Sequence, residues 1–336
     1  MGVCLLAALL YVRLAPVPNW WPLLVLDTFA LYVFGAFVGV AALALVLWSR
    51  ALSLLFLAAA LFFVQQFSGP LLSLAGLSGA PVATADESRP RLRLLTLNLH
   101  SPNNDPTPFM PLIRRADPDV IVLQEVTTEF AQRFDALVQD EYLYSATTGT
   151  YSDHEGTGTW SRLPLVEPEL LRPSRFGNSM HRVRISTGHG DVWLYNVHLP
   201  NPTGDNREDG RLAMLRRFNT AHRDFELRWL IEQTEQLDIP FILAGDFNTE
   251  AGSYQYRSFP EIWQDAFAAA GRGFGNTYPA PAHEGADTSR WVIPFALLRI
   301  DYILTSPEVR AVRVWTDEVK DSDHFSLAAD LELTVR

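Results

Sequence analysis

The chain has 336 residues and a formal net charge of −11. Residues 1–85 contain two arginines and one aspartate, so the rest of the chain carries a charge of −12. An acidic main part argues against a protein that holds nucleic acid through nonspecific phosphate contacts. The single cysteine, Cys4, excludes an intrachain disulfide and a thiolate zinc site, and it leaves the redox compartment open.

The N-terminal part has the composition of a membrane anchor. Asp27 is the only charged residue between Pro16 and Ser49, and none occurs from Ala51 to Ala85. Because a membrane helix needs about 20 apolar residues, we expect one span from Leu23 to Trp48 and another from Leu52 to about Leu77. The sequence thus predicts that this part lies in a lipid bilayer.

The first apolar stretch, Val3 to Ala15, is short and contains Arg13. It fits a third span, a re-entrant piece or a cleaved signal peptide. The signal peptide has the least support, because no basic segment precedes the stretch and no clear cleavage site follows it. We expect an anchor of two or three transmembrane helices over residues 1–77, a linker over 78–90 and a catalytic domain over 91–336.

The orientation of the anchor rests on few charges. Arg50 lies between the two firm spans, and by the positive-inside tendency it places this connection in the cytoplasm and the main domain outside. Arg89, Arg91 and Arg93 after the last span argue the other way, but large domains cross largely regardless of charge. We therefore predict a multi-pass cell-membrane protein whose catalytic domain is extracytoplasmic.

The main part has strand patterns at short intervals, separated by turn residues. Helical patterns are fewer and cover about residues 108–115, 129–139, 212–236 and 261–270. This balance predicts an α+β fold, a β-sandwich of two packed sheets with helices outside, rather than an alternating parallel sheet. The strand patterns are "LRLLTLNL", "DVIVLQEV", "HRVRIS", "DVWLYNVHL", "FILAGDF", "IDYIL", "VRAVRVW" and "SLAADLEL".

Nearly every apolar strand is bounded by an amide, an acid or an imidazole. A carboxylate at a buried strand end is costly unless another group compensates its charge. Such ends, gathered at one edge, would form a divalent-metal site, and oxygen ligands from Asn98, Glu125 and Asp323 suit Mg²⁺, with Mn²⁺ as a substitute. The polar residues at strand ends are Asn98, Glu125, His198, Asp246, Asn248, Asp301, Asp323 and His324.

Six ordered motifs resemble the endonuclease/exonuclease/phosphatase superfamily, which includes pancreatic-type deoxyribonuclease, apurinic-site endonuclease and neutral sphingomyelinase. The motifs are "LTLNLH", "VIVLQEV", "NVHLPN", "LAGDFN", "RIDYIL" and "SDHFSL". The resemblance covers roughly residues 91–336 and implies a four-layer αββα sandwich. It also implies metal-dependent hydrolysis of a phosphate ester.

The resemblance assigns a role to each strand-end residue. It implies that Glu125 binds the metal, with Asn98 and Asp323 completing the ligand shell. Asp246 would be the general base for the attacking water, and Asn248 would hold that water or a phosphate oxygen. His198 and His324 would donate to phosphate oxygens, with Asp301 orienting His324.

Two further residues are candidates for substrate binding. His100 stands where nucleases of the apurinic-site type have an acid, which puts second-metal schemes in doubt; its imidazole can ligate or contact phosphate. Asn201 either contacts phosphate or caps a turn. The histidines outside the motifs are predicted to be surface residues: His154, His181, His189, His222 and His283.

The fold alone does not identify the ester, because one scaffold serves many substrates. The anchor favours a lipid-linked or envelope phosphate, and the acidic charge disfavours duplex DNA. A membrane-tethered nuclease and a catalytically silent binding protein are the alternatives, although the metal carboxylate and the base are both retained. Residues 202–211 and 277–295 form the long loops expected to contact substrate. The sequence identifies no protein partner.

Overall fold

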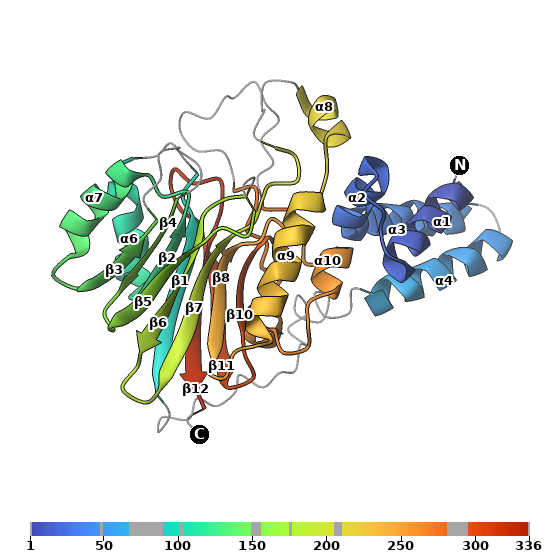
Figure 1. Cartoon of the computed structure of the whole chain (residues 1–336). Helices are drawn as coiled ribbons and strands as arrows, with labels where there is room; N and C mark the ends of the chain where they lie inside the picture. The colour runs from blue at the N-terminus through green and yellow to red at the C-terminus, as the bar shows by residue number, and fades with distance from the viewer. Residues whose placement is uncertain are drawn as a thin grey trace.

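The computed structural model describes residues 2–47, 50–66, 90–100, 104–148, 156–174, 177–204, 210–280 and 295–334. They form a two-sheet sandwich with a group of helices from the N-terminus docked on one side (Figure 1). The predicted linker 78–90 lies outside these residues except for Pro90.

The first sheet has six strands in the order β11-β12-β1-β2-β4-β3. Its only parallel pair among the described strands is β1 and β2, with Asn98 opposite Gln124 in the register. The strands are β1 (Arg91–Asn98), β2 (Val120–Gln124), β3 (Tyr144–Thr147), β4 (Thr157–Ser161), β11 (Val309–Asp317) and β12 (Ser326–Leu333).

The second sheet repeats this plan in the order β5-β6-β7-β8-β10-β9. Its central pair, β7 and β8, is parallel, and β10 is antiparallel to β8. The strands are β5 (Leu165–Leu171), β6 (Met180–Ser186), β7 (Asp191–His198), β8 (Phe241–Asp246), β9 (Gln264–Asp265) and β10 (Asp301–Thr305).

Three apolar clusters hold the layers together. The largest lies between the sheets and is built from Val, Leu, Ile and Ala at alternate strand positions. A second packs α6 (Met110–Ala116) and α7 (Thr128–Val138) on the outer face of the first sheet. A third packs α9 (Ala221–Thr234) on the outer face of the second sheet, near α10 (Tyr254–Arg257). The short helix α11 (Ala266–Ala270) packs into the cluster between the sheets. The structure thus confirms the predicted α+β sandwich with helices on both faces (Figure 1).

The predicted helix over residues 212–236 is two helices. A short helix, α8 (Gly210–Arg216), ends before α9 begins at Ala221. Asn219 separates them, and its side-chain oxygen accepts from the backbone of Ala221 at 2.9 Å. Local capping by a short polar side chain competes with helix continuation, which accounts for the interruption.

The described N-terminal residues form four helices: α1 (Gly2–Leu14), α2 (Trp21–Thr28), α3 (Ala30–Leu47) and α4 (Arg50–Gln66). None of them is by itself long and apolar enough to cross a bilayer, but α2 and the first part of α3, Ala30–Val40, pass that test together with a bend of 74° between them. The helix predicted to run without interruption from Leu23 to Trp48 is therefore broken at Phe29, and Trp48 lies outside the described residues.

The second predicted span coincides with α4 as far as Gln66, and residues 67–77 lie outside the described part of the chain. The apolar stretch Val3 to Ala15 is helical as α1 and packs beside α2. The membrane anchor itself stays a prediction.

Candidate active site

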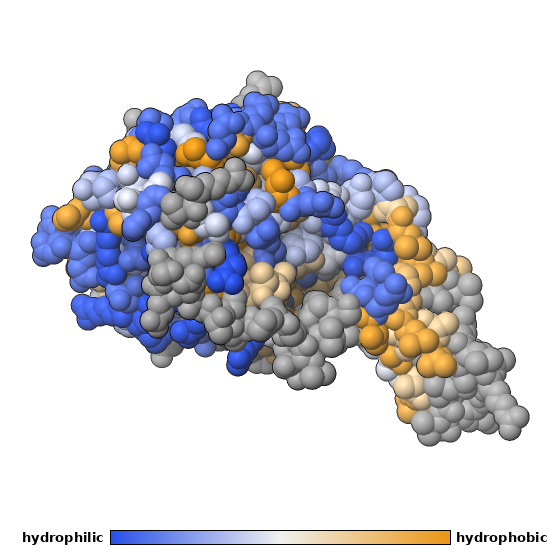
Figure 2. All heavy atoms as spheres, turned by 90° about the horizontal axis from the view of Figure 1, so that it is seen from below, coloured by the Kyte–Doolittle hydropathy of each residue, from blue (hydrophilic) through white to orange (hydrophobic). Residues whose placement is uncertain are grey.

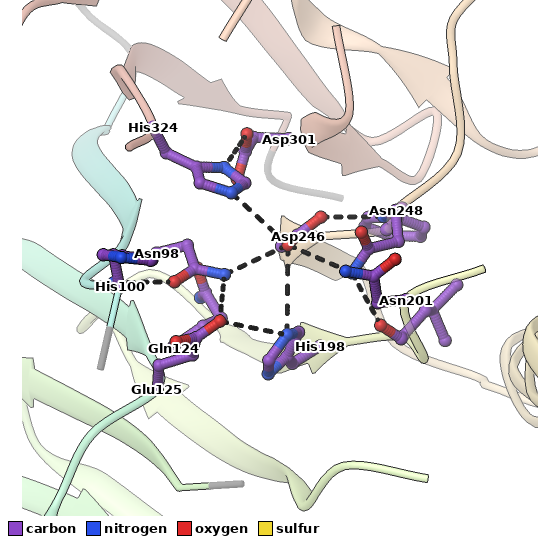
Figure 3. A network of polar contacts seen from close by, with 12 residues as sticks. Asn98, His100, Gln124, Glu125, His198, Asn201, Asp246, Asn248, Asp301 and His324 are labelled. Carbon is purple, nitrogen blue, oxygen red and sulfur yellow. Dashed lines mark hydrogen bonds and ion pairs between the residues drawn. The ribbon is translucent and has the colours of Figure 1, made fainter. Parts of the chain in front are cut away.

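Six strands bring their polar ends to one edge of the sandwich. The parallel pairs β1–β2 and β7–β8 end there, and the antiparallel strands β10 and β12 begin there. In the second sheet, His198 and Asp301 are both register partners of Asp246 on the neighbouring strands. The fold therefore gathers the strand-end residues in one place, as predicted (Figure 3).

Unusual backbone conformations turn these side chains into the site. Glu125 and Asn248 have left-handed φ values of 57° and 47°, and His100 has 56°. Gly245 has a φ of 142°, and a Cβ built on it would lie 2.0 Å from the carbonyl oxygen of Val197. Only glycine fits that approach, which explains the "AGD" in the strand before Asp246.

Asp246 is the buried centre of the site. Its Oδ2 accepts from the amide of Asn98 at 3.1 Å, and its Oδ1 accepts from the backbone of Asn248 at 2.7 Å. The Nε2 atoms of His198 and His324 each lie 3.9 Å from the same Oδ2 (Figure 3). Burial raises the pKa of Asp246 to about 7, the Asp301 carboxylate also raises it, and His324 opposes them. A carboxyl group with such a pKa is suited to general-base chemistry near neutral pH.

His324 and Asp301 form a direct pair. The Nδ1 of His324 lies 2.8 Å from Oδ2 of Asp301, and the ring packs against Tyr278 with 4.9 Å between centroids. Burial alone lowers the pKa of His324, but the Asp301 carboxylate outweighs it and raises that pKa to about 10. His324 is therefore a charged donor whose Nε2 faces Asp246, in the arrangement predicted for it.

The predicted metal ligands lie on the other side of Asp246. Asn98 donates to Oε1 of Glu125 at 3.1 Å, and its oxygen accepts from the backbone of His100 at 3.0 Å. The imidazole Nδ1 of His100 lies 3.0 Å from Oδ1 of Asp323. Glu125 and Asp323 both line the cavity described below, so the carboxylates of both predicted ligands are open to it.

This donor set fits a divalent cation of the Mg²⁺ or Mn²⁺ type, because it offers carboxylate oxygens. Asn98 presents its nitrogen to Glu125, so it acts here as a hydrogen-bond donor. Among the described residues, the group of three whose ligand atoms all lie within 4.8 Å of one another is a different one, Asp246, Asp301 and His324. We favour the first group, because the hydrogen bond between His324 and Asp301 already explains the second.

A cavity of about 700 Å³ opens above these residues. Asn248, one of the residues in its floor, is fixed by a hydrogen bond from Nη1 of Arg223 to its carbonyl oxygen. The sequence analysis did not identify Arg223, and it placed Thr28 and Phe29 in a membrane span, whereas all three line the cavity. No local pattern marks them, since tertiary contacts bring them there.

The other histidines divide into two groups. His189 and His222 are exposed, as predicted, and His222 lines the cavity. His181 is 3% exposed, so its assignment to the surface was wrong. Its two ring nitrogens each lie 2.9 Å from a threonine hydroxyl, those of Thr157 and Thr159. His154 and His283 lie outside the described residues.

Asn201 caps a turn in this structure. Its side-chain oxygen accepts from the backbone and the hydroxyl of Thr203, at 2.9 and 2.8 Å. Asn201 also lines the cavity, so the turn holds it beside the site. Of the predicted substrate loops, Pro202–Gly204 and Tyr278 line the cavity, and residues 205–209 and 281–294 lie outside the described part of the chain.

Comparison with solved structures shows the same fold in other proteins. An endonuclease/exonuclease/phosphatase from Beutenbergia cavernae is 23% identical, with a TM-score of 0.53 over 73% of this chain and 72% of that chain. Truncated TDP2 of Caenorhabditis elegans is 15% identical, with a TM-score of 0.56 over 72% and 98%. A family member from Bacteroides vulgatus is 18% identical, with a TM-score of 0.56 over 72% and 99%.

No curated protein sequence matches this chain significantly. The sequence profile of the Endonuclease/Exonuclease/phosphatase family matches residues 95–324, which cover the six motifs except for the last three residues of "SDHFSL". The chain belongs to the endonuclease/exonuclease/phosphatase family and is a metal-dependent phosphoric ester hydrolase.

Proposed function

We propose that the protein is a membrane-anchored, Mg²⁺-dependent phosphoesterase that hydrolyses a lipid-linked or envelope phosphate. The observation that carries the hydrolytic part is the position of Asp246, buried between two imidazoles and two amide side chains at the floor of the cavity. This arrangement offers one base and several donors to a single phosphate group.

The side chains divide the chemistry among them. Asp246 takes a proton from water while the water oxygen attacks phosphorus, and Asn248 holds that water in line. The bond between phosphorus and the ester oxygen breaks, and the leaving oxygen takes up a proton. His198 and His324 donate to the phosphoryl oxygens as negative charge builds on them. When bound by Glu125 and Asp323, a divalent cation would supply Lewis-acid stabilisation of the same charge.

The test is hydrolysis of bis(p-nitrophenyl) phosphate by the full chain in detergent, with chelator and with Mg²⁺ or Mn²⁺. We expect activity only with a divalent cation. Glu125→Gln keeps the size of the side chain and removes its charge, so it should abolish the metal-dependent activity while the protein keeps its melting temperature. The exposed Glu141→Gln is the matched control. Full activity of Glu125→Gln in chelator would refute the metal assignment.

The membrane part of the proposal rests on exposed apolar side chains. Val40 and Leu43 on α3 and Leu57 and Leu61 on α4 are each more than half exposed. Figure 2 shows hydrophobic residues gathered where these helices extend from the sandwich. An exposed apolar surface of this kind is typical of contact with lipid or another protein. We propose that α3 and α4 insert into the bilayer and hold the cavity near its surface.

The orientation has its own experiment. We propose that the catalytic domain is extracytoplasmic, on the basis of Arg50, the first residue of α4. A reporter that is active only outside the cytoplasm should then give a signal when it is fused after Arg336. A cytoplasmic signal would reverse the orientation and make inner-leaflet lipids or intracellular phosphates the better substrates.

A nuclease is the alternative function. TDP2 of D. rerio, 17% identical, was crystallised with a single-strand DNA product. The net charge of −11 disfavours nonspecific nucleic-acid binding. Cleavage of a single-strand oligonucleotide at a higher kcat/KM than any lipid-like diester would favour the nuclease. A protein that hydrolyses neither would be the catalytically silent binding protein.

A further inference from the structure

Part of the lining of the cavity is apolar. Phe29 comes from the corner between α2 and α3, and Met214 and Leu215 come from α8. Phe218, in the segment that follows α8, completes this group, here called the apolar wall. A segment close to the N-terminus thus faces catalytic residues that come from far later in the chain.

A buried acid holds the N-terminal part of this wall. Asp27 is 2% exposed, and its Oδ2 accepts from the backbone of Tyr254 at 2.6 Å. Nη1 of Arg257 lies 3.5 Å from Oδ1 of Asp27, and Nη2 donates to the carbonyl of Val12 at 2.7 Å. The one charged residue of an otherwise apolar stretch therefore binds the catalytic domain at α10, the short helix that follows Asp246 and Asn248 in the chain.

Other polar contacts flank Phe29 on both sides. Asn19 donates to the side-chain oxygen of Asn219 at 2.7 Å, and its own oxygen accepts from the backbone of Thr220 at 3.3 Å. On the other side, the hydroxyl of Tyr32 donates to the carbonyl of Leu297. Residues 19–32 are thus attached to the catalytic domain at three separate points, which fixes the position of Phe29.

We propose that the apolar wall binds the hydrocarbon part of an amphiphilic phosphate ester, and that Asp27 positions the wall by docking the N-terminal helices. The inference rests on the proposed phosphoesterase function and names its substrate class. The N-terminal helices then form part of the active site as well as an attachment to the membrane.

The chemistry of the cavity favours this class over a polyanion. The donors for a phosphate group, His198 and His324, line the same cavity as the apolar wall. Among the described lining residues there is one arginine, Arg223, and no lysine. Arg223 is 4% exposed, and its guanidinium donates to the carbonyl oxygen of Asn248. A nucleic acid would need cations along the cavity for its flanking phosphates, whereas an alkyl chain gains free energy by leaving water for this wall.

The test compares two soluble esters, p-nitrophenyl ethyl phosphate and p-nitrophenyl octyl phosphate, with the full chain in one detergent. The ratio of kcat/KM for octyl over ethyl measures the contribution of the wall. Phe29→Ala should lower this ratio by about tenfold, the effect of losing roughly two buried methylene contacts. Phe225→Ala on α9, an exposed position outside the cavity, should leave the ratio unchanged. Partition of the octyl ester into micelles cancels in each comparison with the wild type.

Two further variants keep the test decisive if Phe29→Ala does not fold. Leu215→Ala shortens a side chain of the apolar wall that belongs to the catalytic domain, and it should lower the same ratio. Asp27→Ala should lower the octyl-to-ethyl ratio by releasing the docked helices. Asp27→Asn keeps an acceptor for the backbone of Tyr254 and should therefore preserve most of the wild-type ratio.

The outcomes separate the two levels of the proposal. Wild-type hydrolysis of both esters with unchanged ratios in Phe29→Ala and Leu215→Ala would overturn the apolar subsite and leave the phosphoesterase function standing. Hydrolysis of neither ester by the wild type would overturn the function, and the subsite with it.

Discussion

Two polar regions of the sandwich lie close together and differ in kind. Between the sheets, the amide of Gln124 donates to Asn196 at 2.9 Å, and Asn196 donates to the carbonyls of Leu123 and Gly158. These groups are neutral and satisfy one another. At the strand edge, by contrast, the imidazoles of His198 and His324 stay 3.9 Å from Asp246. The closed network specifies the structure, whereas the open charged one is arranged to bind and react.

If this distinction holds, the largest effect on turnover should come from Asp246. Asp246→Asn keeps the shape and removes the base, so kcat on a phosphodiester should fall by about 10²–10⁴. The melting temperature should stay at or above that of the wild type, because the substitution removes a buried charge. A variant with wild-type kcat would show that another group activates the water.

The pair of His324 and Asp301 should have the next largest effect. Loss of one transition-state donor in His324→Ala should lower kcat by about 10²–10³. Asp301→Ala only loosens the orientation of the ring and should cost about 10-fold to 100-fold. The double variant should then be little worse than His324→Ala alone. Kinetics of all three at saturating Mg²⁺ decide this, and fully additive losses would mean that Asp301 acts independently of the histidine.

The closed network should respond in stability instead. Asn196→Ala removes one of the two acceptors of the Gln124 amide and the side-chain donor to two backbone carbonyls, which should lower the free energy of unfolding by about 3 kcal/mol. The turnover of the folded protein should stay close to that of the wild type, because Asn196 contacts no group of the site. Denaturant unfolding and kcat measured together test this. A large fall in kcat without loss of stability would erase the distinction between the two regions.

The smallest effect concerns His181 in the interior. Burial lowers the pKa of His181 to about 4, whereas the same imidazole in the unfolded chain has a pKa of about 6.5. Between these pH values the unfolded chain binds a proton and the folded protein does not. The stability that His181 contributes is present above pH 6.5 and is lost as the pH falls toward 4. Between pH 7 and 5 the wild type should lose about 2 kcal/mol from this residue. His181→Gln should lack that loss, and equal pH dependence of both proteins in thermal unfolding would contradict the buried neutral state.

The sequence predicted the sandwich and the gathering of its strand-end residues, because both follow from local patterns. Alternating apolar residues mark strands, and an acid or amide after a buried strand marks the active edge. The same alternation marks His181, which shares a strand face with the buried Val183 and Ile185. That signal was available and was missed.

The docking of the N-terminal helices had no comparable signal. Whether the stretch around Phe29 runs straight or bends depends on contacts with residues that lie far along the chain. Asp27 gave a hint, since a charge in an apolar stretch requires a partner. Its partners, Tyr254 and Arg257, belong to no motif and only the folded structure shows them.

The docking contacts also order the assembly of the protein in time. Asn19 meets Asn219 and Asp27 meets Tyr254, which are separations of 200 and 227 residues. During synthesis the N-terminal helices leave the ribosome long before their docking surface exists, and contacts between residues so distant in the chain are slow to form. The cavity acquires its last wall only when the catalytic domain has folded. A nascent or truncated chain therefore cannot present the complete cavity.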